Sequence, residues 1–141
     1  MTSTPLFHLA FPVYNLEKTK EFYTKILDCE VGRKSDKWID FNFFGHQITA
    51  HLTQKINTKN KISNAVDGKN VPIRHFGLIM NWEDWHNVKD KLILHKIKFV
   101  IKPYIRFEGE IGEQATLFFS DPSSNYIELK SFRNKEMVFA S

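Results

Sequence analysis

Four residues of metal-ligand type, His8, His51, His75 and Glu128, lie in short stretches of this 141-residue chain. Imidazole and carboxylate groups bind divalent ions such as Fe²⁺, Zn²⁺, Ni²⁺, Co²⁺ and Mn²⁺. In each stretch the alternate positions are apolar, so the four side chains fall on the polar faces of predicted strands. The sequence therefore predicts a divided metal site whose ligands come from four strands.

Two similar half-chains carry these strands. In the first half, a strand over 6–13 is followed by a helix that begins after Asn15, a good N-cap residue. In the second half, a strand over 75–80 is followed by a helix after Asn81. Each helix precedes further strand-like stretches. The pattern of strand, helix and about three strands, given twice, predicts an α+β fold of two βαβββ modules. The further strands are expected at 38–44, 47–53, 97–101, 115–119 and 125–130.

The chain is expected to form a single domain over residues 1–141. Module one is expected at 5–53 and module two at 72–132, with a polar linker over 54–71 between them. The linker is rich in lysine but contains no aromatic residue that could stack on a base. With a net charge of only +4 and scattered basic residues, the sequence argues against nucleic-acid binding.

Composition excludes other classes. The chain has no run of about 18 apolar residues, so no membrane span is expected. Cys29 is the only cysteine, which rules out an internal disulfide and favours a cytoplasmic protein. A homodimer is expected, because small open sheets leave edges and apolar walls that a second copy can cover.

Three motifs resemble those of the vicinal oxygen chelate superfamily, which includes glyoxalase I, type I extradiol dioxygenases and bleomycin-resistance proteins. The first is Phe7-His-Leu-Ala-Phe-Pro-Val13, followed by Glu21-Phe-Tyr-Thr-Lys-Ile-Leu27. The second is Arg74-His-Phe-Gly-Leu78, and the third is Phe118-Phe-Ser-Asp-Pro-Ser-Ser-Asn-Tyr-Ile-Glu-Leu129. The resemblance covers nearly the whole chain. It implies that the two βαβββ modules form an open, curved mixed sheet around a central metal cleft that holds a divalent ion.

The resemblance assigns roles by position. His8, His75 and Glu128 match three metal ligands, and His51 lies on the last strand of module one. As in extradiol dioxygenases, three ligands would suffice, with Fe²⁺ favoured, Glu128 in the catalytic set and His51 as acid or base. Alternatively, His51 is a fourth ligand, as in glyoxalase I-type lyases or isomerases, which act on thiol-conjugated 2-oxoaldehydes. A third possibility is a metal-free binding protein of the bleomycin-resistance type.

Candidate contacts to a small-molecule substrate follow from strand parity and charge. Trp38 and Asp40 share the polar strand face, and Tyr126 is close to Glu128 in sequence. Arg106 lies in a segment, 104–113, that is expected to join two strands; its planar fork suits a carboxylate or phenolate. Two alternatives remain open: Arg106 can pair outward with a glutamate of its own loop, and Tyr126 can cover a sheet edge.

Overall fold

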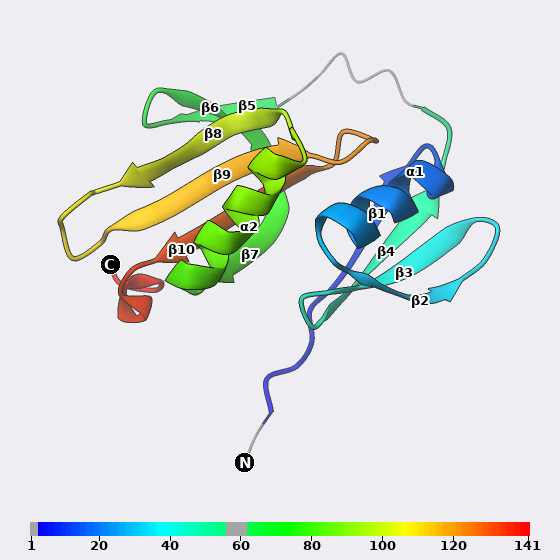
Figure 1. Ribbon diagram of the computed structural model, residues 1–141, viewed down its shortest axis with the longest axis horizontal. Coiled ribbons are helices and arrows are strands. Elements are labelled where there is room, and N and C mark those ends of the chain that lie inside the picture. The colour runs from blue at the N-terminus through cyan, green and yellow to red at the C-terminus, as the bar shows by residue number, and fades with distance from the viewer. Residues whose placement is uncertain (1–2, 56–61) are drawn as a thin grey trace. The chain divides into compact units, whose positions relative to one another are not determined.

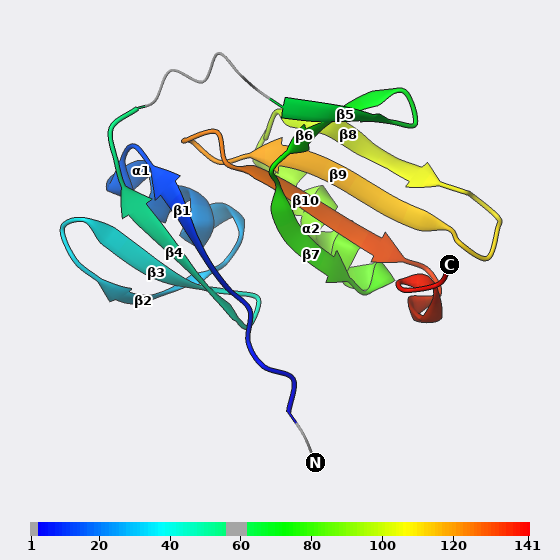
Figure 2. The same cartoon turned by 180° about the vertical axis from the view of Figure 1, so that it is seen from behind.

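The computed structural model describes residues 3–55 and 62–141. Of these residues, 3–55 and Asp121–Asn125 form one compact unit, which we call unit 1. The remainder, 62–120 and Tyr126–Ser141, forms unit 2. Each unit contains one strand–helix–three-strand module, so the predicted α+β fold of two βαβββ modules is confirmed (Figures 1 and 2). Among the described helices, none is long and apolar enough to span a membrane.

Unit 1 is a four-stranded mixed sheet in the order β1-β4-β3-β2, with β1 and β4 parallel. The predicted N-cap is confirmed, because the Asn15 side chain accepts a hydrogen bond from the Lys18 backbone N–H. Tyr23, in the π-helical turn η1, is fully buried and stacks on Phe41 of the sheet, so the helical segment covers its apolar face. The elements are β1 (His8–Val13), α1 (Leu16–Glu21), η1 (Phe22–Ile26), β2 (Glu30–Lys34), β3 (Trp38–Phe43) and β4 (His46–Leu52).

A loop from the second half of the chain completes unit 1. Asp121 is buried and accepts hydrogen bonds from the Tyr23 hydroxyl, the Asn125 side chain and two backbone N–H groups. The Tyr14 N–H donates to Ser123 Oγ, and Asn125 also donates to the Pro12 carbonyl. The Asp-Pro-Ser-Ser-Asn motif therefore belongs to the core of the first module, although it joins strands of the second.

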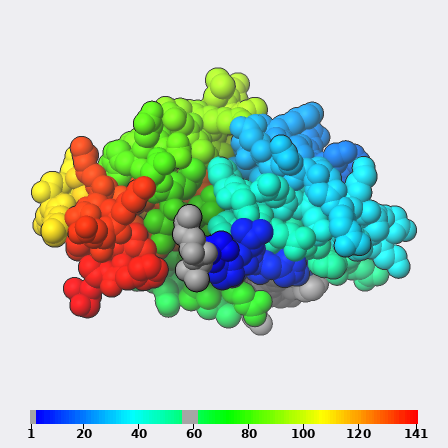
Figure 3. Space-filling view, turned by 90° about the horizontal axis from the view of Figure 1, so that it is seen from below, coloured from blue at the N-terminus to red at the C-terminus, as the bar shows by residue number. Residues whose placement is uncertain are grey.

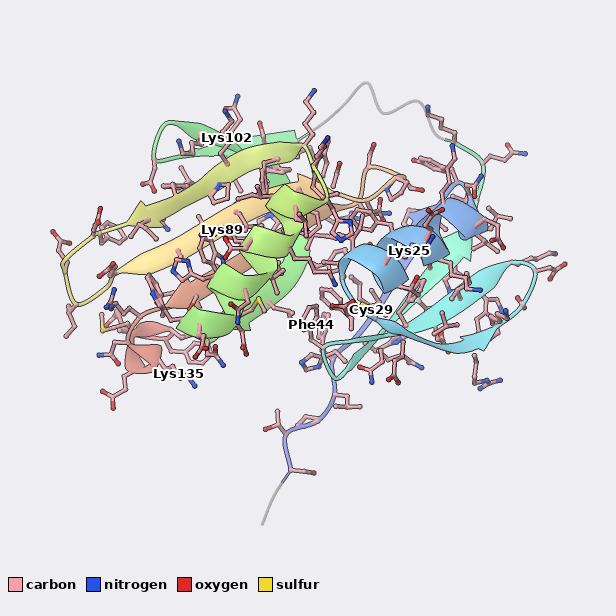
Figure 4. The ribbon with its side chains drawn as sticks, viewed as in Figure 1. Lys25, Cys29, Phe44, Lys89, Lys102 and Lys135 are labelled. Carbon is pink, nitrogen blue, oxygen red and sulfur yellow. The ribbon has the colours of Figure 1, made fainter. Side chains whose placement is uncertain are left out.

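Unit 2 repeats the plan in the order β7-β10-β9-β8, with β7 and β10 parallel. One face of the sheet is covered by α2, which begins after the predicted N-cap Asn81 and bears Lys89 (Figures 1 and 4). Trp85 of α2 is buried and donates its indole N–H to the Leu129 carbonyl. The chain after Phe132 reaches the surface (red in Figure 3). The elements are β7 (Phe76–Met80), α2 (Trp82–Leu94), β8 (Phe99–Arg106), β9 (Gln114–Ser120), β10 (Tyr126–Phe132) and η2 (Lys135–Met137).

Part of the expected polar linker is in fact ordered structure. Strands β5 (Ile62–Val66) and β6 (Lys69–Ile73) form an antiparallel hairpin beside β8 (Figure 1). Its two-residue turn is Asp67-Gly68, and both residues have positive φ, as a type I′ turn requires. The Asp-Gly pair between two short strands is the sequence signal for this hairpin. Residues 56–61 of the expected linker lie outside the described residues.

Candidate metal centre

His75 and Glu128 meet on the face of the unit 2 sheet that lies opposite α2. His75 Nε2 is 3.1 Å from Glu128 Oε1, and the side chains are 28% and 15% exposed. Close strand pairing makes this approach possible. Gly77 lies opposite Glu128 in the β7–β10 register, and a Cβ there would lie 1.6 Å from the Glu128 carbonyl oxygen. Because glycine has no Cβ, strands β7 and β10 can approach closely here, and His75 lies next to Glu128.

Hydrogen bonds fix both side chains. His75 Nδ1 is 2.7 Å from the Pro72 carbonyl oxygen; because that oxygen carries no hydrogen, Nδ1 is the donor and holds a proton. The Thr116 hydroxyl donates to Glu128 Oε2 at 2.6 Å. Nε2 of His75 and Oε1 of Glu128 are therefore the atoms left to share a proton or a cation. A backbone carbonyl on the outer ring nitrogen is the usual support of a metal-binding histidine.

The surroundings of His75 and Glu128 shift both pKa values toward the charged forms. The hydrogen bond to Glu128 raises the pKa of His75; burial opposes this effect, and the Pro72 carbonyl adds to it. Burial alone would raise the pKa of Glu128. The hydrogen bonds from His75 and Thr116 and the charge of Lys130 outweigh burial, so the pKa of Glu128 is lowered. Both shifts favour the charged forms of the two groups, an imidazolium beside a carboxylate.

The donor spacing fits a divalent ion. Ligand bonds of about 2.0–2.1 Å at angles of roughly 90–110° place two donor atoms about 2.8–3.4 Å apart. The separation between Nε2 and Oε1 is 3.1 Å. Within the part of the chain that the structure describes, no group of three or more His, Cys, Asp or Glu side chains could hold a metal ion. His75 and Glu128 thus supply two donors, and His8, which is exposed on β1, stays a predicted ligand.

The strand register shows which residue of β4 corresponds to Glu128 of unit 2. In unit 2, Glu128 lies opposite the residue two positions after His75. In unit 1 the residue two positions after His8 is Ala10, and its partner on β4 is Thr49. His51 instead pairs with Pro12, four positions beyond His8, or about 13 Å along the strand. Thr49, not His51, is therefore the counterpart of Glu128, and the register does not bring His51 and His8 together. The two predicted roles of His51, as a fourth ligand or as acid or base, both stay predictions.

The predicted substrate residues fall into different surroundings. Asp40 accepts hydrogen bonds from Thr49 Oγ1 at 2.6 Å and Gln47 Nε2 at 3.4 Å, within an open hollow of unit 1 of about 280 Å³. Trp38 is half-buried beneath the Arg33 guanidinium. Tyr126 is half-buried and, by parity, shares the face of Glu128.

Arg106 is placed differently from the sequence expectation. It lies on β8 rather than in a connecting loop, because β8 extends to this residue. Its guanidinium pairs with Asp67 of the β5–β6 turn, not with a glutamate of the following loop.

Sequence reasoning missed two side chains on the same face, those of Thr116 and Tyr104. Thr116 of β9 is the cross-strand partner of Lys130 on β10 and of Tyr104 on β8, so the three side chains share one face of the sheet. The Thr116 hydroxyl also donates a hydrogen bond to Glu128. Thr116 is itself buried, and strand alternation puts it on the face opposite to Ala115 and Leu117. Tyr104 required knowledge that β8 continues past Ile101. It supplies a phenol on the Glu128 face.

Comparison with known proteins decides the family. The sequence profile of the Glyoxalase/Bleomycin resistance protein/Dioxygenase superfamily matches residues 6–129. The chain belongs to this superfamily. The fold is similar to that of a glyoxalase/bleomycin resistance protein/dioxygenase from Alicyclobacillus acidocaldarius, with 29% identity, 96% of each chain covered and a TM-score of 0.75.

Two further solved structures are similar in fold to this chain at lower sequence identity. The fosfomycin resistance protein FosX from Listeria monocytogenes is 17% identical, with 97% of this chain and 100% of that chain covered and a TM-score of 0.67. A virulence protein from Salmonella typhimurium is 22% identical, with 94% and 99% covered and a TM-score of 0.62.

Proposed function

We propose that the protein is a metal-dependent enzyme, of extradiol-dioxygenase-like type, that acts on a small molecule through two neighbouring oxygens. The observation that carries this proposal is the His75–Glu128 pair, in which Nε2 and Oε1 face each other at 3.1 Å while Pro72 and Thr116 hold the other two polar atoms. His8 is proposed as the third ligand because of its residue type and its place in the first family motif. Two imidazoles and one carboxylate suit Fe²⁺, with positions left for substrate.

Each side chain of the pair has a defined task. The Pro72 carbonyl keeps the proton on Nδ1 of His75, so Nε2 offers its lone pair once its own proton has left. The Thr116 hydroxyl holds one oxygen of Glu128, which leaves the other oxygen directed at His75. A bound divalent ion would act as a Lewis acid that lowers the pKa of an enol or catechol. Lys130, on the same face, adds positive charge beside the site.

Thr49 favours the dioxygenase-like proposal over a glyoxalase I-type lyase. The resemblance assigns such lyases a fourth ligand, commonly a carboxylate, on the last strand of module one. Here the counterpart of Glu128 is Thr49, a largely buried hydroxyl that already donates to Asp40. A second carboxylate base is therefore missing from this position, and proton shuttling between two ligand carboxylates is not supported.

Substrate turnover tests the proposal. Protein loaded with Fe²⁺ without oxygen is mixed with a panel of catechols, and oxygen uptake is recorded, in parallel with hemithioacetal isomerisation by the Ni²⁺ and Zn²⁺ forms. Fosfomycin is included because one protein of similar fold is a fosfomycin resistance protein. Oxygen uptake that disappears in Glu128→Gln is the expected result. Isomerisation without oxygen uptake would favour the lyase, and no bound metal in any form would favour a binding protein.

We further propose a cytoplasmic homodimer, on the ground of the single cysteine, Cys29, and the open sheets. Analytical ultracentrifugation of the 16.6 kDa chain should give twice that mass. A single species at the mass of one chain would contradict the dimer.

A further inference from the structure

A second cluster of polar side chains lies on the Glu128 face of unit 2, around the turn of the β5–β6 hairpin. The Asp67 carboxylate accepts hydrogen bonds from Arg106 through Nε and Nη2 and from the Tyr104 hydroxyl, the last at 3.0 Å. The Lys69 ammonium lies 4.7 Å from the centre of the Tyr104 ring. These contacts lower the pKa of Asp67, chiefly through the hydrogen bonds from Arg106 and Tyr104.

The donors of this cluster are built into the sheet, whereas the acceptor is not. Tyr104 and Arg106 are cross-strand partners of Thr116 and Gln114 on β8 and β9. Asp67 comes from a two-residue turn of a two-stranded hairpin, and every residue of β5 is exposed. The Asp67 side chain itself is 37% exposed. Two hydrogen-bond donors that are fixed in the sheet, Tyr104 and Arg106, thus bind a carboxylate that comes from a peripheral turn.

We propose that Tyr104 and Arg106 form a binding subsite for a substrate carboxylate, and that Asp67 occupies this subsite until the substrate replaces it. The planar fork of arginine and a phenol hydroxyl are typical donors for a carboxylate. Exposed ion pairs contribute little to stability, so Asp67 can be exchanged for an incoming anion. Release of Asp67 leaves Arg106 on β8, because its strand pairing does not depend on the hairpin.

The position of this subsite narrows the substrate class, an inference that rests on the proposed function. Tyr104 pairs with Thr116, two residues before the partner of Glu128, and β9 separates the two strands. The strand spacings place Tyr104 and Glu128 on the order of 10 Å apart. Glu128 is near enough to add to the raised pKa of Tyr104, which is due first to burial and then to Asp67. The substrate class is therefore a small molecule with vicinal oxygens at one end and a carboxylate at the other.

The test uses metal-free protein, so that it does not depend on the metal site. Benzoate and its neutral analogue benzamide are titrated into the wild type and Asp67→Asn, with the Nε–H of Arg106 followed by NMR. Asparagine removes the charge and still suits the type I′ turn. If Asp67 fills the subsite about nine-tenths of the time, Asp67→Asn binds benzoate about tenfold more tightly. Benzamide should bind to neither protein.

Two controls complete the design. Asp67→Asn combined with Arg106→Gln should lose benzoate binding. Asp90→Asn, on the opposite face of the sheet beside Lys89, removes the same charge and should match the wild type (Figure 4). Equal benzoate affinity of the wild type and Asp67→Asn, or equal binding of benzamide, would overturn the subsite. Inorganic phosphate bound as tightly as benzoate would overturn its assignment to carboxylates. The two proposals can fail separately. If the wild type binds benzoate as expected but binds no divalent metal ion, the subsite stands and the proposed metal-dependent function is refuted.

Discussion

Metal binding should weaken by at least about tenfold for each pH unit below the raised pKa of His75. In the metal-free protein, one proton of His75 is held by the Pro72 carbonyl and the other by Glu128, 3.1 Å from Nε2. An ion that binds Nε2 must displace this second proton. One proton released for each ion bound gives a tenfold change in apparent affinity per pH unit, about 1.4 kcal/mol.

Glu128 sets the pH below which the metal affinity begins to fall. Its hydrogen bond is the largest cause of the raised pKa of His75. In Glu128→Gln, the pH-dependent range should therefore move to lower pH, while the affinity at its plateau falls because a carboxylate ligand is lost. The same linkage has a defined sign in metal-free protein. The pair stabilises the fold between the lowered pKa of Glu128 and the raised pKa of His75, and this contribution disappears as pH rises through the latter.

Competition with a chromogenic chelator measures the effect with Co²⁺, which is stable in air. The wild type, Glu128→Gln and His95→Ala are titrated across the acid and neutral range. His95 caps the C-terminal end of α2, so His95→Ala should follow the wild type. A Co²⁺ affinity of the wild type that does not change with pH on the acid side would refute the assignment of His75 Nε2. If the Co²⁺ affinity of Glu128→Gln depends on pH in the same way as that of the wild type, Glu128 does not set the pKa of His75.

Three substitutions test the packing that supports the site, each measured by urea unfolding of metal-free protein. Gly77→Ala should destabilise the chain by about 3 kcal/mol, because its Cβ would lie 1.6 Å from the Glu128 carbonyl oxygen; a loss below about 1 kcal/mol would contradict the close approach. Ser131→Ala should stabilise the chain by about 1 kcal/mol, because among the described residues its Oγ is fully buried without a hydrogen-bond partner; destabilisation would show that this hydroxyl is satisfied. Tyr23→Phe should destabilise it by about 1–3 kcal/mol, since buried Asp121 loses one donor; no change would contradict that contact.

The sequence predicted those parts of the fold that follow from local patterns. Both helix starts were found because asparagine N-caps stand directly before each helix. Strand parity placed Glu128 and Tyr126 on the face opposite α2, because the apolar positions between them must be buried. The end of β8 was missed, because Pro103 interrupts the apolar pattern that marked its start.

Register and long-range pairing could not be predicted from one sequence. His51 and Thr49 lie on the same face of β4, and only the pairing with β1 shows that Thr49 is the counterpart of Glu128. The Asp67–Arg106 pair joins residues 39 positions apart. Its acidic member comes from a segment whose composition had predicted a linker. Hydrogen bonds of this kind depend on tertiary packing rather than on periodicity.

The most direct test of the metal centre is an NMR titration of the histidine rings with Zn²⁺. We expect that, at one equivalent, Nε2 of His75 loses its proton and shifts while Nδ1 keeps its proton on the Pro72 carbonyl, and that Glu128→Gln weakens this change. His95 should not respond. Zn²⁺ that binds at one equivalent and leaves the His75 ring unchanged would contradict the account.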